Sequence, residues 1–89
     1  MNSAPTLTLI GAAKSRGGEW GRDDFDVYEN CRVVGRIMRH PQAPKDRPWF
    51  WTITARLPQT PEDRGYSVSR SQAMTDFKAR WVRPPGANE

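Results

Sequence analysis

Most of the large apolar side chains of this 89-residue chain fall between Phe25 and Trp81, and this limits where a core can form. A chain of this length buries only about 60 to 65% of its surface on folding, so the core must be small. Four tryptophans are available, and an aromatic side chain buries about 150 to 250 Å². We therefore predict one globular domain over residues 20–82, with a partly flexible segment before it at 1–19 and a frayed tail after it at 83–89.

Residues 24–29 alternate between apolar and polar types, the period of a strand with one buried face, and a second strand is expected over 32–39. Because Asn30 tolerates left-handed backbone, we expect a hairpin with a three-residue loop over 30–32. This register sets three pairs across the hairpin: Val27 with Gly35, Phe25 with Ile37, and Asp26 with Arg36. It gathers apolar side chains on one face and opposite charges on the other.

A third strand is predicted over 49–55, where Trp49, Trp51 and Ile53 share the face that we expect to meet the helix. Residues 66–68 are a possible short fourth strand. The alternation at Thr6 to Ile10 is compatible with an edge strand, but residues 14–18 have the composition of a flexible linker.

The sharpest local signal is a helix start at Ser69. Ser69 to Gln72 fits a capping box, in which each side chain satisfies a backbone N–H at the other residue. Four apolar residues then recur at helical spacing: Ala73, Met74, Phe77 and Trp81. The Pro84-Pro85-Gly86 run ends the helix near Val82. The predicted fold is therefore α+β, a three- or four-stranded antiparallel meander with one C-terminal helix packed on one face.

Four motifs carry a resemblance to known sequences. They are Trp20-x-x-Asp23-Asp24-Phe25-Asp26-Val27, Val34-Gly35-Arg36-Ile37, Pro48-Trp49-Phe50-Trp51-Thr52 and Gly65-Tyr66-x-x-Ser69-Arg70-x-x-Ala73-Met74. Over about residues 20–81 the chain resembles a group of small bacterial proteins to which no function is assigned. The resemblance implies no activity and no site residues.

The residues that could support catalysis are few. Cys31 and His40 are the only cysteine and histidine, and nine residues of strand would hold them about 30 Å apart. One cysteine forms no internal disulfide, and the pair builds no zinc cage. We expect a cytoplasmic, non-enzymatic protein without a cofactor. No apolar run is long enough for a membrane span.

An acidic cluster at Asp23, Asp24 and Asp26 has two interpretations. Asp24 and Asp26 would lie on the same side of a strand, a geometry that could hold a metal ion. No further ligand is evident, and Arg36 is the expected neighbour. We therefore favour a cross-strand ion pair and predict no metal site.

Eleven of the fourteen basic residues are arginines, and the formal net charge is +4. Arginine favours planar contacts with phosphates. The best candidate function is thus an arginine-mediated contact of the open sheet face with nucleic acid. The candidate site residues are Arg36, Arg39, Lys45, Arg47, Arg56 and Tyr28.

Two alternatives compete with the nucleic-acid hypothesis. The N-terminal segment could cover the open face through Leu7, Leu9 and Trp20, which would make a second core. Otherwise an exposed apolar patch, formed by Tyr28, Val34, Met38 and Phe50, would favour a partner protein or a homodimer over a monomer. Edge pairing through the strands at 24–29 or 49–55 is a related route to association.

Overall fold

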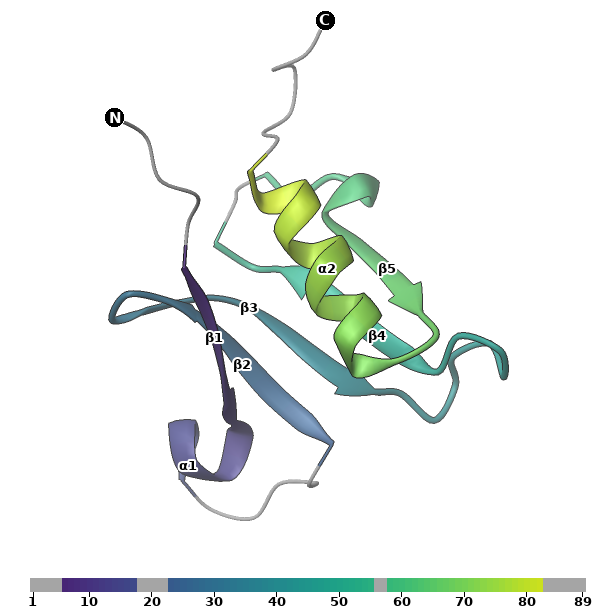
Figure 1. The fold of residues 1–89 in the computed structure, drawn as a ribbon, viewed down its shortest axis with the longest axis horizontal. Coiled ribbons are helices and arrows are strands. Elements are labelled where there is room, and N and C mark those ends of the chain that lie inside the picture. The colour runs from purple at the N-terminus through teal and green to yellow at the C-terminus, as the bar shows by residue number, and fades with distance from the viewer. Residues whose placement is uncertain (1–5, 18–22, 56–57, 83–89) are drawn as a thin grey trace, which may run out of the picture.

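The structure is a computed structural model that describes residues 6–17, 23–55 and 58–82. It contains a five-stranded antiparallel sheet with the strand order β1-β2-β3-β4-β5, so each strand pairs with its neighbour in sequence (Figure 1). The elements in chain order are β1 (Leu7–Gly11), α1 (Ala12–Arg16), β2 (Asp24–Glu29), β3 (Arg32–Arg39), β4 (Trp49–Ile53), the 3₁₀ helix η1 (Pro61–Asp63), β5 (Arg64–Ser67) and α2 (Arg70–Trp81). The predicted α+β meander with a C-terminal helix is confirmed.

The number of strands differs from the prediction, because the sheet has five strands and not three or four. Both edge strands come from segments whose sequence signal was weak. β1 pairs along its whole length with β2, from Leu7 opposite Glu29 to Gly11 opposite Phe25. The linker expected at 14–18 begins inside α1, which ends at Arg16 and is followed by Gly17 at φ 77°.

The predicted hairpin register is confirmed, although the turn that produces it is different. Val27 pairs with Gly35, and the register then shifts so that Tyr28 pairs with Val33. The connection is therefore shorter than the expected three-residue loop, with Asn30 in the left-handed region at φ 60°. A β-bulge at Val34 supplies the extra residue and turns this side chain into the core.

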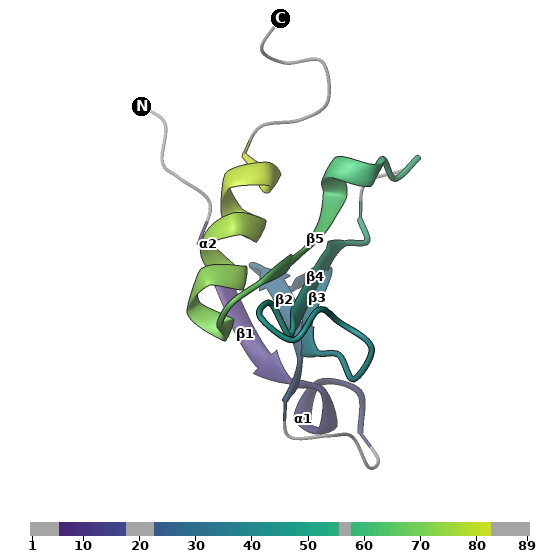
Figure 2. The ribbon, with the colours of Figure 1, turned by 90° about the vertical axis from the view of Figure 1, so that its right-hand side faces the viewer.

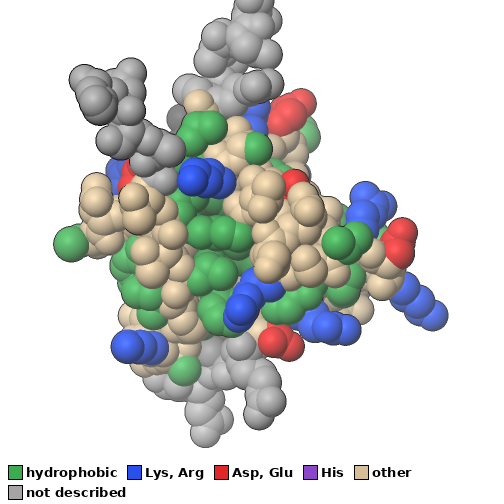
Figure 3. Space-filling view, viewed as in Figure 1, with side chains coloured by type: hydrophobic (Ala, Val, Ile, Leu, Met, Phe, Trp, Pro, Cys, Tyr) green, Lys and Arg blue, Asp and Glu red, His purple; other side chains and the backbone are tan. Residues whose placement is uncertain are grey.

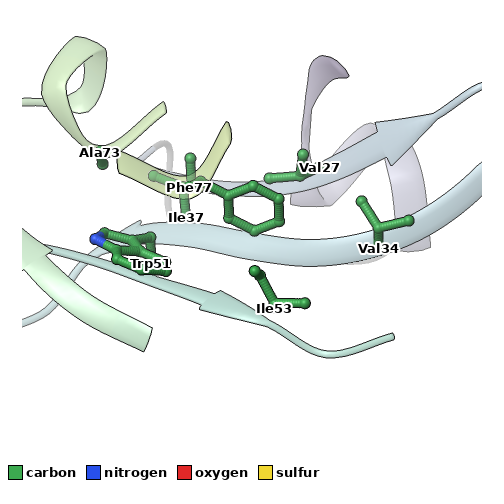
Figure 4. Close-up of a cluster of buried hydrophobic side chains, with 7 residues drawn as sticks. All are labelled: Val27, Val34, Ile37, Trp51, Ile53, Ala73 and Phe77. Atoms are coloured by element: carbon green, nitrogen blue, oxygen red, sulfur yellow. The ribbon is translucent and has the colours of Figure 1, made fainter. Parts of the chain in front are cut away.

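The core lies between the sheet and α2, which covers β3, β4 and β5 on one side (Figures 1 and 2). Seven buried residues form it: Val27, Val34, Ile37, Trp51, Ile53, Ala73 and Phe77 (Figure 4). Trp51 and Phe77 meet edge to face with ring centroids 6.2 Å apart. The prediction that the helix stripe packs on the Trp51 and Ile53 face is therefore confirmed.

Gly35 is the point of closest approach between the sheet and α2. A Cβ placed on Gly35 would collide with the Phe77 ring and with the Thr52 carbonyl oxygen. The ring of Phe77 therefore rests directly on the backbone of β3. No other residue type fits at Gly35 without displacing α2.

Gly35→Ala should lower the free energy of unfolding by about 1 to 3 kcal/mol, the usual range for overpacking a core. Gly11→Ala is the control, because Gly11 is also a strand residue, at the end of β1, and its added Cβ would meet nothing within 4 Å. Urea denaturation of the two variants measures the difference. Equal stability of both would show that the approach of Phe77 to β3 is not tight.

One of the two hydrogen bonds predicted for the capping box at the N-terminus of α2 is present. The Ser69 hydroxyl accepts from the Gln72 backbone N–H at 3.0 Å. The Gln72 side chain, however, donates to Asp76 at 2.9 Å and does not return to Ser69. A full capping box occurs instead at η1, between Thr60 and Asp63.

A buried ion pair ties α2 to η1. Asp63 is fully buried, and its Oδ1 accepts from Arg80 Nε at 2.9 Å. Burial alone would raise the pKa of Asp63, but the hydrogen bonds from Thr60 and Arg80 outweigh it and hold the pKa below its ordinary value. The folded state thus prefers ionised Asp63, and this preference contributes stability above the pKa of the unfolded chain.

The stabilisation from Asp63 should be lost as pH falls below about 4, the ordinary pKa of the unfolded carboxyl group. Asp63→Asn should lower the free energy of unfolding at neutral pH by about 3 kcal/mol, because it leaves Arg80 without its charged partner. It should also lose less stability between neutral and acidic pH than the unaltered protein does. The control is Asp46→Asn, since the Asp46 side chain is exposed and its contact with Arg47 is long, at 4.0 Å. An unchanged acid dependence in Asp63→Asn would contradict the assignment.

Candidate nucleic-acid interface

The side of β3, β4 and β5 opposite α2 carries the candidate interface. Alternation along the strands puts six side chains there, which we call the open face: Arg36, Met38, Phe50, Thr52, Arg64 and Tyr66. Among the described helices, α1 lies against β1 and β2, and α2 lies on the other side of the sheet (Figure 2). The open face is therefore left without a covering helix in the part of the chain that the structure describes.

Three rings form a row across the open face and the end of β3. Phe50 and Tyr66 are cross-strand partners with ring centroids 5.3 Å apart. His40 meets the other side of Phe50 edge to face at 5.9 Å. Tyr66 is 39% exposed, while Phe50 and His40 are partly exposed. We call His40, Phe50 and Tyr66 the aromatic row.

Arg36 lies on the open face as predicted but is already engaged. Its Nε and Nη2 donate to the two carboxylate oxygens of Asp24 at 3.0 and 2.5 Å. The hydrogen bond to Asp24, together with the charges of Asp24 and Asp26, raises the pKa of Arg36 despite its partial burial. The guanidinium group is held by a carboxylate, so Arg36 is a structural residue of this face before it is a ligand-binding one.

Tyr28 is also occupied. Its hydroxyl lies 2.6 Å from the Ser15 hydroxyl, so Tyr28 sits under α1. The expectation that Leu7 and Leu9 cover the open face is wrong, because both side chains pack against the α2-side core. α1 covers the β1 and β2 end instead, and Trp20 lies outside the described residues.

The remaining predicted cations are spread over different places. Arg39 pairs with Trp49, so alternation puts it on the α2 side of the sheet. Lys45 and Arg47 are exposed in the loop that joins β3 to β4, which is also the end of the sheet where His40 meets Phe50. Arg56 lies outside the described residues. The six predicted site residues therefore do not form one cluster.

Arg64 and Tyr66 are the residues of the open face that sequence analysis missed. β5 begins at Arg64, two residues earlier than the predicted short strand at 66–68, so Arg64 was assigned to a loop. It is exposed, and its Nη1 donates to Gln59 at 3.2 Å. The alternation of Arg64 and Tyr66 around Gly65 was the available signal.

The apolar patch expected from Tyr28, Val34, Met38 and Phe50 is not present as predicted. The bulge buries Val34 completely, and α1 contacts Tyr28 through Ser15. Met38 and Phe50 remain, paired across β3 and β4 and partly exposed. The predicted edges are also wrong, since β2 and β4 are paired on both sides and the edges are β1 and β5.

A cross-strand ion pair with Arg36 is present as expected, and its carboxylate is that of Asp24, which lies diagonal to Arg36 in the register. Asp26 is opposite Arg36 and only 4% exposed. Within the described residues, no group of three His, Cys, Asp or Glu side chains is placed to hold a metal ion. Cys31 is exposed at the tip of the hairpin. No helix among these residues is long and apolar enough to cross a bilayer.

Comparisons with known proteins add no assignment. No family model, curated protein or solved structure matches the chain. The resemblance to small bacterial proteins stays a prediction, and function must be argued from the geometry.

Arg36→Gln should lower the free energy of unfolding by about 1 to 3 kcal/mol, because it leaves the Asp24 carboxylate without its charged partner. Arg64→Gln is the matched control on the same face, and its effect should stay within about 0.5 kcal/mol since Arg64 is exposed. Thermal and urea unfolding measure both variants. Equal effects would show that the bond between Arg36 and Asp24 contributes nothing to stability.

Proposed function

We propose that the open face binds single-stranded nucleic acid. The observation that carries this proposal is the aromatic row, in which Phe50 lies between His40 and Tyr66. Tyr66 is the most exposed ring of the three. Exposed rings on an open sheet are a binding surface for unstacked bases, because every base has a face that stacks on an aromatic ring.

Cations near the aromatic row supply contacts for the phosphate backbone. Arg64 lies two residues before Tyr66 on β5, so both side chains are on the same side of the sheet, and Arg64 is exposed. Lys45 and Arg47 extend from the loop that His40 begins. A strand stacked on Phe50 and Tyr66 would therefore have cations within reach at two ends. This arrangement favours single strands over duplexes, whose bases are already stacked on each other.

The charge of the face supports moderate, salt-dependent binding. Asp24 neutralises Arg36, and Arg47 lies 4.0 Å from Asp46, so the excess positive charge comes from Arg64 and Lys45, within a chain of net charge +4. Each phosphate contact steepens the dependence of binding on salt, and stacking adds about 1 to 3 kcal/mol per base. The proposal assigns no catalytic step and no cofactor. It also takes the domain to act in the cytoplasm, in keeping with the single exposed Cys31.

Binding of labelled oligonucleotides, followed by fluorescence anisotropy at about 50 mM salt, tests the proposal. Tyr66→Ala should weaken binding to a random single strand by about tenfold, as the loss of one stacked base predicts. Tyr66→Phe is the matched control, because it keeps the ring and should bind as the unaltered protein does. Arg64→Gln should weaken binding to all sequences alike and reduce the salt slope by about one unit.

The proposal fails if the folded protein shows no binding at this salt concentration. It also fails if a duplex binds as tightly as the single strand, or if Tyr66→Ala binds like Tyr66→Phe. Circular dichroism of each variant confirms that the fold is retained. Tyr66 contributes an exposed side chain and lies outside the α2-side core, so these variants should remain folded.

A further inference from the structure

A second surface lies on the other side of the sheet, beside α2, and does not depend on the proposed function. It consists of five partly buried apolar side chains, which we call the apolar strip: Leu7, Leu9, Phe25, Met74 and Trp81. Leu7 and Leu9 come from β1, Phe25 from β2, and the other two from α2. In Figure 3 apolar surface is visible between β1 and α2 in the same view as Figure 1.

The strip exists because one helix is too narrow for this sheet. Five strands are about 19 Å across, from four gaps of about 4.8 Å, whereas a helix with its side chains is about 10 Å wide. The ring of Phe77 on Gly35 holds α2 over β3, β4 and β5. The uncovered part of this face, over β1 and β2, is therefore about as wide as one further helix.

The side of α2 that borders the strip is basic. Arg70, Met74, Lys78 and Trp81 recur at spacings of four, four and three, so they follow one side of the helix. Two contacts fix which side this is: the Arg70 guanidinium lies 5.0 Å from the centre of the Phe25 ring, and Trp81 Nε1 donates to Glu29 at 3.2 Å. The acidic residue of α2, Asp76, lies on the opposite side, where it accepts from Ser67.

Neither Arg70 nor Lys78 forms an ion pair with any described residue, so both can accept an acidic partner. Lys78 is exposed at the solvent side of the strip, and Arg70 lies at its β2 end. An occupant with apolar residues on one face and carboxylates beside them would match both the floor and the rim of this surface.

The described helices of the chain offer no such occupant: α1 is only five residues long and already lies against β1 and β2. A second copy offers only the same strip, because its α2 buries Ala73 and Phe77 in its own core, and its Met74 and Trp81 lie beside the same cations, which would repel their counterparts. The outward residues of α2 are polar or small, among them Ser71, Thr75 and Ala79.

We propose that the apolar strip is a docking site for an acidic amphipathic helix of another protein, which would lie beside α2 on β1 and β2. The helix would place its apolar residues on Leu9 and Met74 and its carboxylates near Arg70 and Lys78. The bound helix and α2 would then cover this face of the sheet together. The domain would connect a protein partner on this side with the ligand of the open face on the other.

Synthetic peptides of about 14 residues, the length needed to span the strip, test the proposal. The probe has leucines at helical spacing with glutamates beside them. Two matched peptides carry lysine for glutamate, or the same residues in scrambled order. In anisotropy measurements the acidic amphipathic peptide should bind at least about tenfold more tightly than either matched peptide.

Variants of α2 locate the site. Met74→Glu places a carboxylate between Arg70 and Lys78 and should weaken binding of the acidic peptide by about tenfold or more. Lys78→Gln should weaken it by about threefold, whereas Thr75→Glu, which changes the net charge by the same amount on the outward side of α2, should not. Tyr66→Ala should have no effect, since it lies on the other side of the sheet.

Three results would overturn the proposal. The first is equal binding of the acidic and lysine peptides, or no binding of either in the millimolar range. The second is peptide binding that Met74→Glu leaves unchanged while the variant stays folded. The third is sedimentation of the free protein as a dimer that Met74→Glu converts to a monomer, because a second copy would then be the occupant.

Discussion

The contact between the Phe77 ring and the backbone of Gly35 sets the geometry on which the rest of the molecule depends. It brings α2 closer to β3 than any side chain on β3 would allow. Trp51 and Ile53 then pack around the same ring from β4, and Val27 from β2. A helix fixed at this point covers the β3, β4 and β5 side of the sheet and leaves β1 and β2 only partly covered. Both proposed binding surfaces follow from this placement, since the open face is the reverse of the covered strands and the apolar strip is the uncovered remainder.

The sequence was most informative where the pattern was local and repeated. Residues 24–29 alternate clearly, and β2 has these bounds, while β3 has the bounds 32–39 expected for the second strand of the hairpin. The helix begins after Ser69 because a hydroxyl there can accept the Gln72 N–H, and this too is visible in the sequence. The two edge strands were harder to predict because β5 is only four residues long and contains Gly65. Whether such a segment becomes a strand is decided by its partner β4, which the local pattern does not contain.

The candidate site could be predicted only in outline. That one face of the sheet would be open, and that Arg36 would lie on it, followed from alternation. The same alternation put Asp24 diagonal to Arg36, and the resulting bidentate pair removes Arg36 from the set of available cations. Val34 was placed on the wrong side because the bulge inserts one residue, and a one-residue shift moves a side chain to the other face. Tyr66 could not be assigned to the site from the sequence, because only the pairing of β5 with β4 brings it beside Phe50.

Cations lie beside both proposed surfaces, whereas several carboxylates are held within the fold. Acidic residues near the open face are used internally: Asp24 binds Arg36, and Asp26 is buried opposite it. Asp63 and Asp76 are likewise held by Arg80 and Ser67, so these carboxylates stabilise the domain and do not face a ligand. Five cations remain exposed at the surface: Lys45, Arg47, Arg64, Arg70 and Lys78. Because these four carboxylates are held within the fold, a modest net charge of +4 leaves cations on two surfaces, one beside the aromatic row and one beside the apolar strip. The neighbouring side chains therefore distinguish the two proposed ligands: the exposed rings of the aromatic row favour unstacked bases, and an apolar floor beside a helix favours another helix.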